Sequence, residues 1–63
     1  MQPYRCYFLD GANHVVRVED RQWPDDASAA VWAESIRERP DDLYSTELWC
    51  RTRLVRRRER SVP

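Results

Sequence analysis

The sequence predicts an α+β domain in which one helix packs on one face of a small antiparallel sheet of three to four strands, in the order ββαββ. Two observations lead to this class. Segments with apolar residues at every second position flank a segment whose apolar residues recur at helical spacing. In addition, 63 residues suffice for one small domain, spanning residues 1–63, that is only marginally stable alone.

The first two strands are predicted to form a hairpin. Residues 3–10, PYRCYFLD, carry large apolar side chains on both faces of an extended chain, and residues 14–23, HVVRVEDRQW, are rich in β-branched residues. Between them the stretch DGAN contains Gly11, the only glycine of the chain, which we expect to supply a positive φ angle. Strict alternation would place Val16 and Val18 on the same face of the second strand.

The helix is predicted over residues 26–39, DASAAVWAESIRER. Pro24 ends the preceding strand, Asp25 or Asp26 can cap the helix, and Pro40 ends it. The apolar stripe that would face the sheet consists of Ala29, Trp32, Ala33 and Ile36.

Two further strands follow the helix. Residues 43–50, LYSTELWC, alternate again, and a short fourth strand is expected from about Arg53 to Arg57, although no glycine marks the turn between them. Residues 59–63 are expected to fray. In a strictly alternating fourth strand, one face carries Leu54, Arg56, Arg58 and Arg60, and the other carries Arg53, Val55 and Arg57.

One helix covers only one face of such a sheet. Tyr7, Leu9 and Trp49 are the candidates for the uncovered face, and exposed aromatic surface of this kind usually marks an interaction site. The simplest cover is a second copy of the chain. We therefore interpret the protein as a non-enzymatic interaction or accessory module, with a homodimer or another protein as its partner.

The basic end of the chain has two interpretations. Residues 51–60 carry six arginines and one acid, whereas residues 1–50 carry five arginines and ten acids. The arginines either contact phosphates, as in a nucleic-acid-associated regulator, or form ion pairs within the protein or across a dimer. The second interpretation is favoured because the acidic body repels nucleic acid. The candidate contacts to phosphate or to an acidic partner are Arg53, Arg56, Arg57, Arg58 and Arg60.

Residue types that support catalysis are scarce. His14 is the only histidine and lies beside a turn, and one glycine cannot form a phosphate loop. The sequence thus predicts no catalytic residues, no metal ligands and no cofactor. Cys6 and Cys50 are expected to be small buried hydrophobes, because no metal-binding spacing relates them. A thiol redox element that uses this pair is a second alternative function.

The cellular location can be predicted from the targeting and membrane-spanning segments that the sequence lacks. No apolar run approaches the roughly 20 residues of a membrane span, and the N-terminus MQPYRCYFLD does not have the layout of a signal peptide. We therefore expect a cytoplasmic protein without a membrane partner, in which both cysteines are reduced.

Several short motifs resemble a known group of proteins. They are YRCYFLD near the N-terminus, the turn leading to His14 and Val15, the Asp-Asp-Ala helix start, and ELW followed by RLV. Over about residues 3–57 this pattern is similar to short, uncharacterised alphaproteobacterial proteins that are domains of unknown function. The resemblance implies a soluble bacterial ββαβ-type domain and carries no catalytic residues. A glycine would be expected in the late turn, where this chain has Arg51-Thr52-Arg53.

Overall fold

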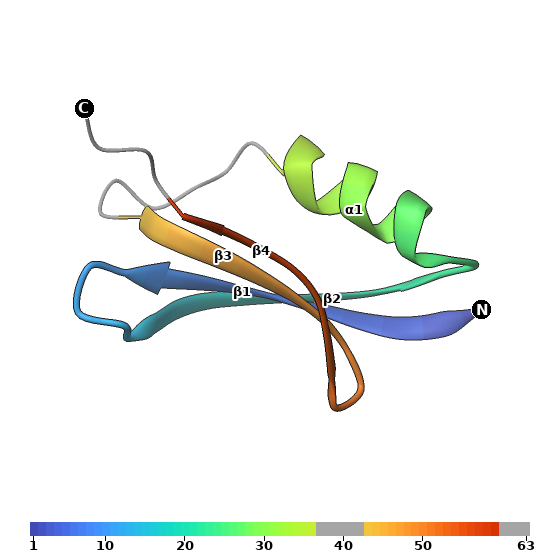
Figure 1. The fold of residues 1–63 in the computed structure, drawn as a ribbon, viewed down its shortest axis with the longest axis horizontal. Helices are drawn as coiled ribbons and strands as arrows, with labels where there is room; N and C mark the ends of the chain where they lie inside the picture. Colours follow the sequence, from blue (N-terminus) through green and yellow to red (C-terminus); the bar gives the residue numbers. More distant parts are fainter. Residues whose placement is uncertain (37–42, 60–63) are drawn as a thin grey trace.

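The computed structural model, which describes residues 1–36 and 43–59, contains a four-stranded antiparallel sheet with one helix over one of its faces (Figure 1). The strand order is β2-β1-β3-β4, so the two hairpins lie side by side and β1 and β3 form the centre. This arrangement confirms the predicted α+β class and the ββαββ order. The elements are β1 (Gln2–Asp10), β2 (Val15–Trp23), α1 (Asp26–Ser35), β3 (Leu43–Cys50) and β4 (Arg53–Glu59).

The helix begins where the sequence places its cap. The Asp25 side chain accepts a hydrogen bond of 2.7 Å from the backbone nitrogen of Ser28, which satisfies one donor of the first turn. α1 ends at Ser35, earlier than predicted, and residues 37–42 lie outside the described part of the chain.

The core lies between the helix and the sheet. Side chains from β1 and β3 meet the helix there, and each strand contributes every second residue because successive side chains alternate between faces. The helix offers the stripe predicted from its spacing, with Ala29 fully buried and Trp32, Ala33 and Ile36 packed against the core. The buried core residues are Tyr4, Cys6, Phe8, Ala29, Leu48 and Cys50.

The turn between β1 and β2 differs from expectation in the residue that takes a positive φ angle. Asn13 adopts φ 64°, whereas Gly11 does not have a positive φ. The Asp10 carboxylate accepts hydrogen bonds from the backbone nitrogens of Ala12 and His14, both at 2.9 Å. Asparagine tolerates the left-handed conformation better than most residues, which explains why Asn13 takes the positive φ angle in this turn.

The turn between β3 and β4 needs the same conformation and has no glycine. Arg51 adopts φ 57° there. A glycine was expected in this turn, and Arg51 stands at the position that would suit it. Arginine pays a steric cost in the left-handed region that glycine would not incur.

Irregular pairing changes which residues share a face of β4. Leu48 is opposite Arg56, but Trp49 is opposite Leu54, so Val55 is an extra residue in a β-bulge. The strict alternation expected for this strand is therefore wrong. The bulge places Leu54 on the face away from the helix and lets Val55 pack against the core. Arg53, Arg56 and Arg58 consequently all lie on the helix side.

A second bulge shifts β2. Phe8 is opposite Arg17 and Leu9 is opposite Val15, which leaves Val16 as the extra residue. Val15, rather than Val16, therefore shares a face with Val18, contrary to the alternation expected from the sequence. β4 itself extends to Glu59, one residue into the segment expected to fray, and residues 60–63 lie outside the described residues.

Candidate protein-interaction face

The sheet has one face that the helix does not cover. In Figure 1 the helix lies over one side of the sheet, and the tip of the β3–β4 hairpin bends away to the other side. We call this second side the open face. Following the strand register, its side chains are Arg5, Tyr7 and Leu9 of β1, Val15, Val18 and Asp20 of β2, Ser45, Glu47 and Trp49 of β3, and Leu54, Arg57 and Glu59 of β4.

The three residues singled out as an interaction face lie together here. Tyr7, Leu9 and Trp49 line one hollow of about 400 Å³, and none of them belongs to the core beneath the helix. Tyr7 and Trp49 are half-buried, whereas Leu9 is only 8% exposed. The aromatic pair therefore offers surface to a partner, and Leu9, two residues beyond Tyr7 on β1, adds a buried side chain to the lining of the hollow.

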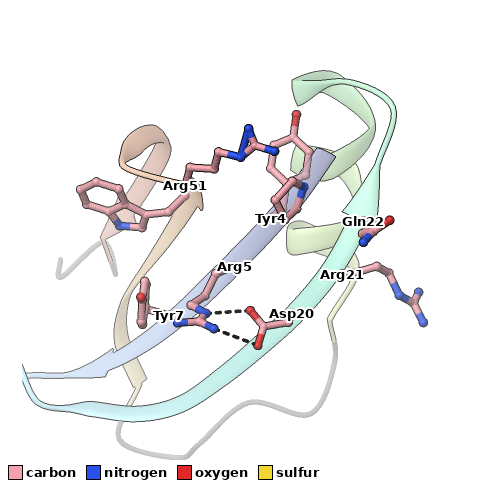
Figure 2. Close-up of a pocket in the computed structure, with 9 residues that line it drawn as sticks. Tyr4, Arg5, Tyr7, Asp20, Arg21, Gln22 and Arg51 are labelled. Atoms are coloured by element: carbon pink, nitrogen blue, oxygen red, sulfur yellow. Dashed lines mark hydrogen bonds and ion pairs between the residues drawn. The ribbon is translucent and has the colours of Figure 1, made fainter. Parts of the chain in front are cut away.

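A second hollow of about 500 Å³ adjoins the first and shares Tyr7 and Trp49 with it (Figure 2). At its wall the Arg5 guanidinium donates a 2.7 Å hydrogen bond from Nε to the Asp20 carboxylate. This charge partner on the neighbouring strand raises the pKa of Arg5. Arg51, from the β3–β4 turn, lines both hollows and forms no ion pair with a carboxylate of the described residues.

Polar contacts hold the rest of the open face. The Trp49 indole Nε1 donates a 2.9 Å hydrogen bond to Glu47, which fixes the ring along the strand. Arg57 lies between two acids, with Nε 3.7 Å from Glu47 and Nη2 3.0 Å from Glu59. The face thus carries both signs of charge beside its apolar side chains.

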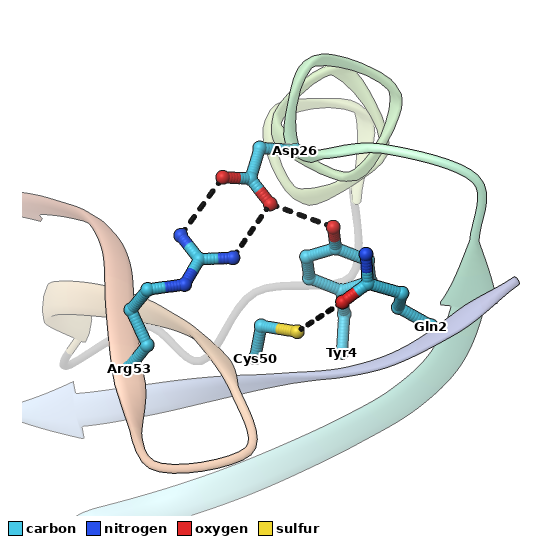
Figure 3. A network of polar contacts seen from close by, with 5 residues as sticks. All are labelled: Gln2, Tyr4, Asp26, Cys50 and Arg53. Atoms are coloured by element: carbon cyan, nitrogen blue, oxygen red, sulfur yellow. Dashed lines mark hydrogen bonds and ion pairs between the residues drawn. The ribbon is translucent and has the colours of Figure 1, made fainter.

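The arginines on the other side of β4 interact with the helix. Both Nη atoms of Arg53 donate to the two carboxylate oxygens of Asp26, at 2.9 and 3.1 Å, and the Tyr4 hydroxyl donates to the same carboxylate at 2.7 Å (Figure 3). The Arg53 guanidinium and the Tyr4 hydroxyl lower the pKa of Asp26 to about 2. The hydrogen bond to Asp26, together with burial, raises the pKa of Tyr4 to about 12.

Glu34 of the helix receives two more arginines. Its Oε1 lies 2.9 Å from Nη2 of Arg56 and 2.7 Å from Nη1 of Arg58. Four of the five arginines considered for phosphate contact therefore have carboxylate partners within the chain, and the fifth, Arg60, lies outside the described residues. These partners are helix and sheet acids, as in the favoured interpretation.

The two cysteines are buried and are not joined by a disulfide. Cys6 is directly opposite Leu48, so Cys50 occupies a diagonal position on the neighbouring strand. Diagonal partners in a sheet lie about 7–8 Å apart, which exceeds the usual Cα separation of a disulfide. The Cys50 thiol instead donates to Oε1 of Gln2 at 3.3 Å (Figure 3).

His14 lies at the exposed turn where the sequence placed it. Its Nδ1 is 3.7 Å from the Asp10 carboxylate, and its side chain is 78% exposed. The backbone nitrogen of His14 donates to Asp10 and lowers the pKa of that carboxyl group. Within residues 1–36 and 43–59, no three His, Cys, Asp or Glu side chains gather closely enough to hold a metal ion.

Three apolar residues of the open face escaped the sequence analysis. Val15, Val18 and Leu54 are 51%, 42% and 44% exposed and surround Tyr7 and Trp49. The bulges decide the face of Val15 and Leu54, and no residue pattern announces a bulge in these strands. Val18 had a signal, because alternation assigned it to one face of the second strand.

Comparison with known proteins adds no relative from which a function could be transferred. No protein-family model, curated protein or solved structure matches this chain. Among the residues that the structure describes, no helix is both long and apolar enough to cross a membrane.

Proposed function

We propose that this protein is a non-enzymatic interaction module whose open face binds a second copy of the chain. The observation that carries the proposal is the grouping of Tyr7 and Trp49 in adjoining hollows, on the side of the sheet opposite the helix. Tyrosine and tryptophan are the residues that most often anchor protein interfaces. Exposed Val15, Val18 and Leu54 extend the apolar area around them.

The charges of the open face favour a second copy over a strongly charged partner. Arg5, Arg51 and Arg57 face or border it, and so do three acids, Asp20, Glu47 and Glu59, which leaves the face without net charge. A symmetric dimer places one patch against itself, so a patch with both signs can be complementary to itself whereas a patch of one sign cannot.

The size of the sheet limits how strongly two copies can bind through the open face. Four strands at about 4.8 Å spacing and about 26 Å in length present about 500 Å² in projection. This area is close to the smallest specific interfaces, which bury about 600 Å² per partner. We therefore expect reversible association with a dissociation constant on the order of micromolar.

The alternative of nucleic-acid binding through the Arg-rich end has less support. Arg53, Arg56 and Arg58 would have to exchange Asp26 and Glu34 for phosphates, which forfeits ion pairs already formed. If they did, affinity for a DNA or RNA oligonucleotide would fall steeply with salt and drop on replacing these arginines by glutamine. Oligonucleotide mobility that the protein leaves unchanged at low salt would remove this alternative.

The redox alternative has no support from the placement of the thiols. Cys6 and Cys50 are both inaccessible to an oxidant in the folded chain, and they occupy diagonal positions. An unchanged mass and melting temperature after treatment with oxidant and with reductant would exclude it. The reducing cytoplasm that the sequence predicts as the location is compatible with two buried thiols.

Sedimentation velocity at about 50 μM tests the proposed self-association. Leu54→Asp places a charge in the apolar part of the open face, so it is expected to weaken association at least tenfold, and Trp49→Ala is expected to do the same by removing an anchor. The matched control is Val31→Asp, because Val31 is 68% exposed on the helix and lies away from the open face. The control is expected to associate like the unmodified chain.

Two results would overturn the proposal. One is an unmodified chain that sediments as a monomer throughout the micromolar range. The other is association that Leu54→Asp and Val31→Asp change equally. Circular dichroism melts of each variant show whether a loss of association reflects unfolding, and Leu54→Asp guards against that because Leu54 is exposed in the single chain.

A further inference from the structure

β2 is an edge strand that is long and exposed. It pairs with β1 along one side, and no other strand of the described residues pairs with its outer side. It spans nine residues, Val15–Trp23, contains neither proline nor glycine, and exposes three valines. An edge of this kind is a template for another strand unless the protein blocks it.

The other edge of the sheet is blocked against pairing with itself. β4 carries Arg56, Arg57 and Arg58 in succession. If two β4 strands paired antiparallel about Arg57, each Arg56 would face the partner's Arg58 and the two Arg57 residues would face each other. Like charges directly opposite in a sheet are destabilising, so this edge repels its own copy.

Of the self-pairing registers of β2 centred on residues 17 to 20, only one avoids like-charge contacts. With Val18 at the two-fold axis, Val18 faces its counterpart. Each Arg17, which already pairs with Glu19 of its own chain, then also faces Glu19 of the other copy. A register centred on Glu19 would oppose two glutamates and bring Arg17 against Arg21. A register centred on Asp20 would oppose two aspartates, and one centred on Arg17 would oppose two arginines.

We propose that two copies of the chain pair through β2, antiparallel and centred on Val18, to form a continuous eight-stranded sheet. The central residues Arg17–Glu19 pair regularly with β1, beyond the bulge at Val16, so their backbone is flat enough to accept another strand. Val18 is 42% exposed in the single chain and is buried against its counterpart in the pair.

This edge interface differs from the interface on the open face, although Val18 borders both. Val18 is opposite Tyr7 in the sheet, so its side chain lies on the open face. Pairing at β2 would therefore join the open faces of the two chains into one continuous surface. The backbone hydrogen bonds of the edge do not involve Trp49 or Leu54, which lie on β3 and β4. Either interface can therefore fail without the other.

Disulfide trapping tests the register directly. Val18→Cys places two thiols opposite each other at the two-fold axis, where Cα atoms of paired strands lie about 4.5–5.5 Å apart, within reach of a disulfide. We expect most of the chain to form a covalent dimer under mild oxidation with oxidised glutathione, seen by non-reducing electrophoresis and mass measurement. The same substitution in a Trp49→Ala chain is expected to crosslink equally, which separates the edge from the open face.

Matched controls report on chance encounters and on other registers. Val31→Cys exposes a thiol on the helix and is expected to crosslink at least tenfold more slowly. Asp20→Cys is expected to crosslink weakly, because it lies two residues from the axis. The unmodified chain shows the contribution of Cys6 and Cys50. Val18→Cys crosslinking no faster than Val31→Cys, or faster crosslinking at residue 20, would overturn the proposal.

Exchanging the charges of Arg17 and Glu19 provides a second, independent test of the register. Glu19→Arg brings Arg17 against an arginine of the other copy twice, so edge pairing measured in the Trp49→Ala background is expected to fall at least tenfold. The double change Arg17→Glu with Glu19→Arg restores opposite charges and is expected to restore pairing. A double variant that stays as weak as the single one, while melting like the unmodified chain, contradicts the register; it would leave an extended segment of another protein as the occupant of this edge.

Discussion

At the scale of single residues, Asp26 connects three elements. It belongs to the first turn of α1, accepts a hydrogen bond from Tyr4 of β1, and forms a two-pronged ion pair with Arg53 of β4. A carboxylate is also favoured at a helix N-terminus by the helix dipole. Asp26 therefore fixes the helix to both the centre and the edge of the sheet. The sequence had suggested only that Asp25 or Asp26 caps the helix.

This contact predicts how stability changes with pH. The pKa of Asp26, about 2 in the folded chain against an ordinary 3.8, means that folding favours the carboxylate. Its contribution is complete above about pH 4 and is lost as pH falls from 4 to 2. The pKa of Tyr4, about 12 against 10.0, means that folding favours the protonated phenol, whose contribution is lost as pH rises from 10 to 12.

Urea unfolding between pH 2 and pH 12 measures both effects. Asp26→Asn is expected to flatten the acid side of the stability curve, and Tyr4→Phe the alkaline side, relative to the unmodified chain. Val31→Ala, on the exposed side of the helix, is the control and should change neither side. The assignment is wrong if Asp26→Asn keeps the acid slope of the unmodified chain.

At the scale of elements, the β3–β4 hairpin decides the charge layout. The bulge at Val55 turns Arg53, Arg56 and Arg58 to the helix side, where Asp26 and Glu34 meet them. Without the bulge these arginines would be divided between the two faces. An irregularity of one residue thus converts a run of positive charge into ion pairs with the helix.

The turn of the same hairpin yields a second prediction. Arg51 occupies the left-handed region at φ 57°, so Arg51→Gly is expected to raise the free energy of unfolding by about 0.5–1 kcal/mol, because relief of the steric cost exceeds the entropy that glycine adds to the unfolded chain. Thr52→Gly, at a position without a positive φ, is expected to lower it by about 0.5–1 kcal/mol. Thermal melts measure both, and a loss of stability in Arg51→Gly would show that the arginine side chain outweighs the backbone cost.

At the scale of the whole molecule, a single helix leaves a sheet with two unprotected regions. The chain is 35 Å long but only 19 and 18 Å across, so its surface is large for its core. The open face exposes apolar area, and the β2 edge exposes backbone. Association of copies would cover both regions and add stability that the short chain lacks alone.

The two proposed interfaces together predict a definite assembly. Two different two-fold interfaces close into a tetramer when their axes intersect at right angles, an arrangement that is open to a face-to-face and an edge-to-edge contact of one sheet. At about 50 μM we expect Trp49→Ala and Glu19→Arg each to give dimers and the combined variant to give monomers. Light scattering after size exclusion measures the masses, and a combined variant that keeps the mass of either single variant would contradict the independence of the interfaces.

Much of this architecture was readable from the residues. Alternation identified β1 and β3, the spacing of Ala29 and Trp32 identified the helix face, and Asp25 identified its start. The placement of Tyr7 and Trp49 away from the helix follows from the same alternation. The faces of Val15, Leu54 and the β4 arginines did not follow, because a bulge inserts one residue and inverts every side chain beyond it.

The sequence by itself determined the α+β class, the order of the elements and the two opposite faces of the central strands, because periods of 2 and 3.6 are local properties of the backbone. Only the tertiary structure decided which arginines meet Asp26 and Glu34, which valines reach the open face, and that Asn13 and Arg51 take positive φ angles. These outcomes depend on how strands register against one another, and register is a property of pairs of segments that no single segment encodes.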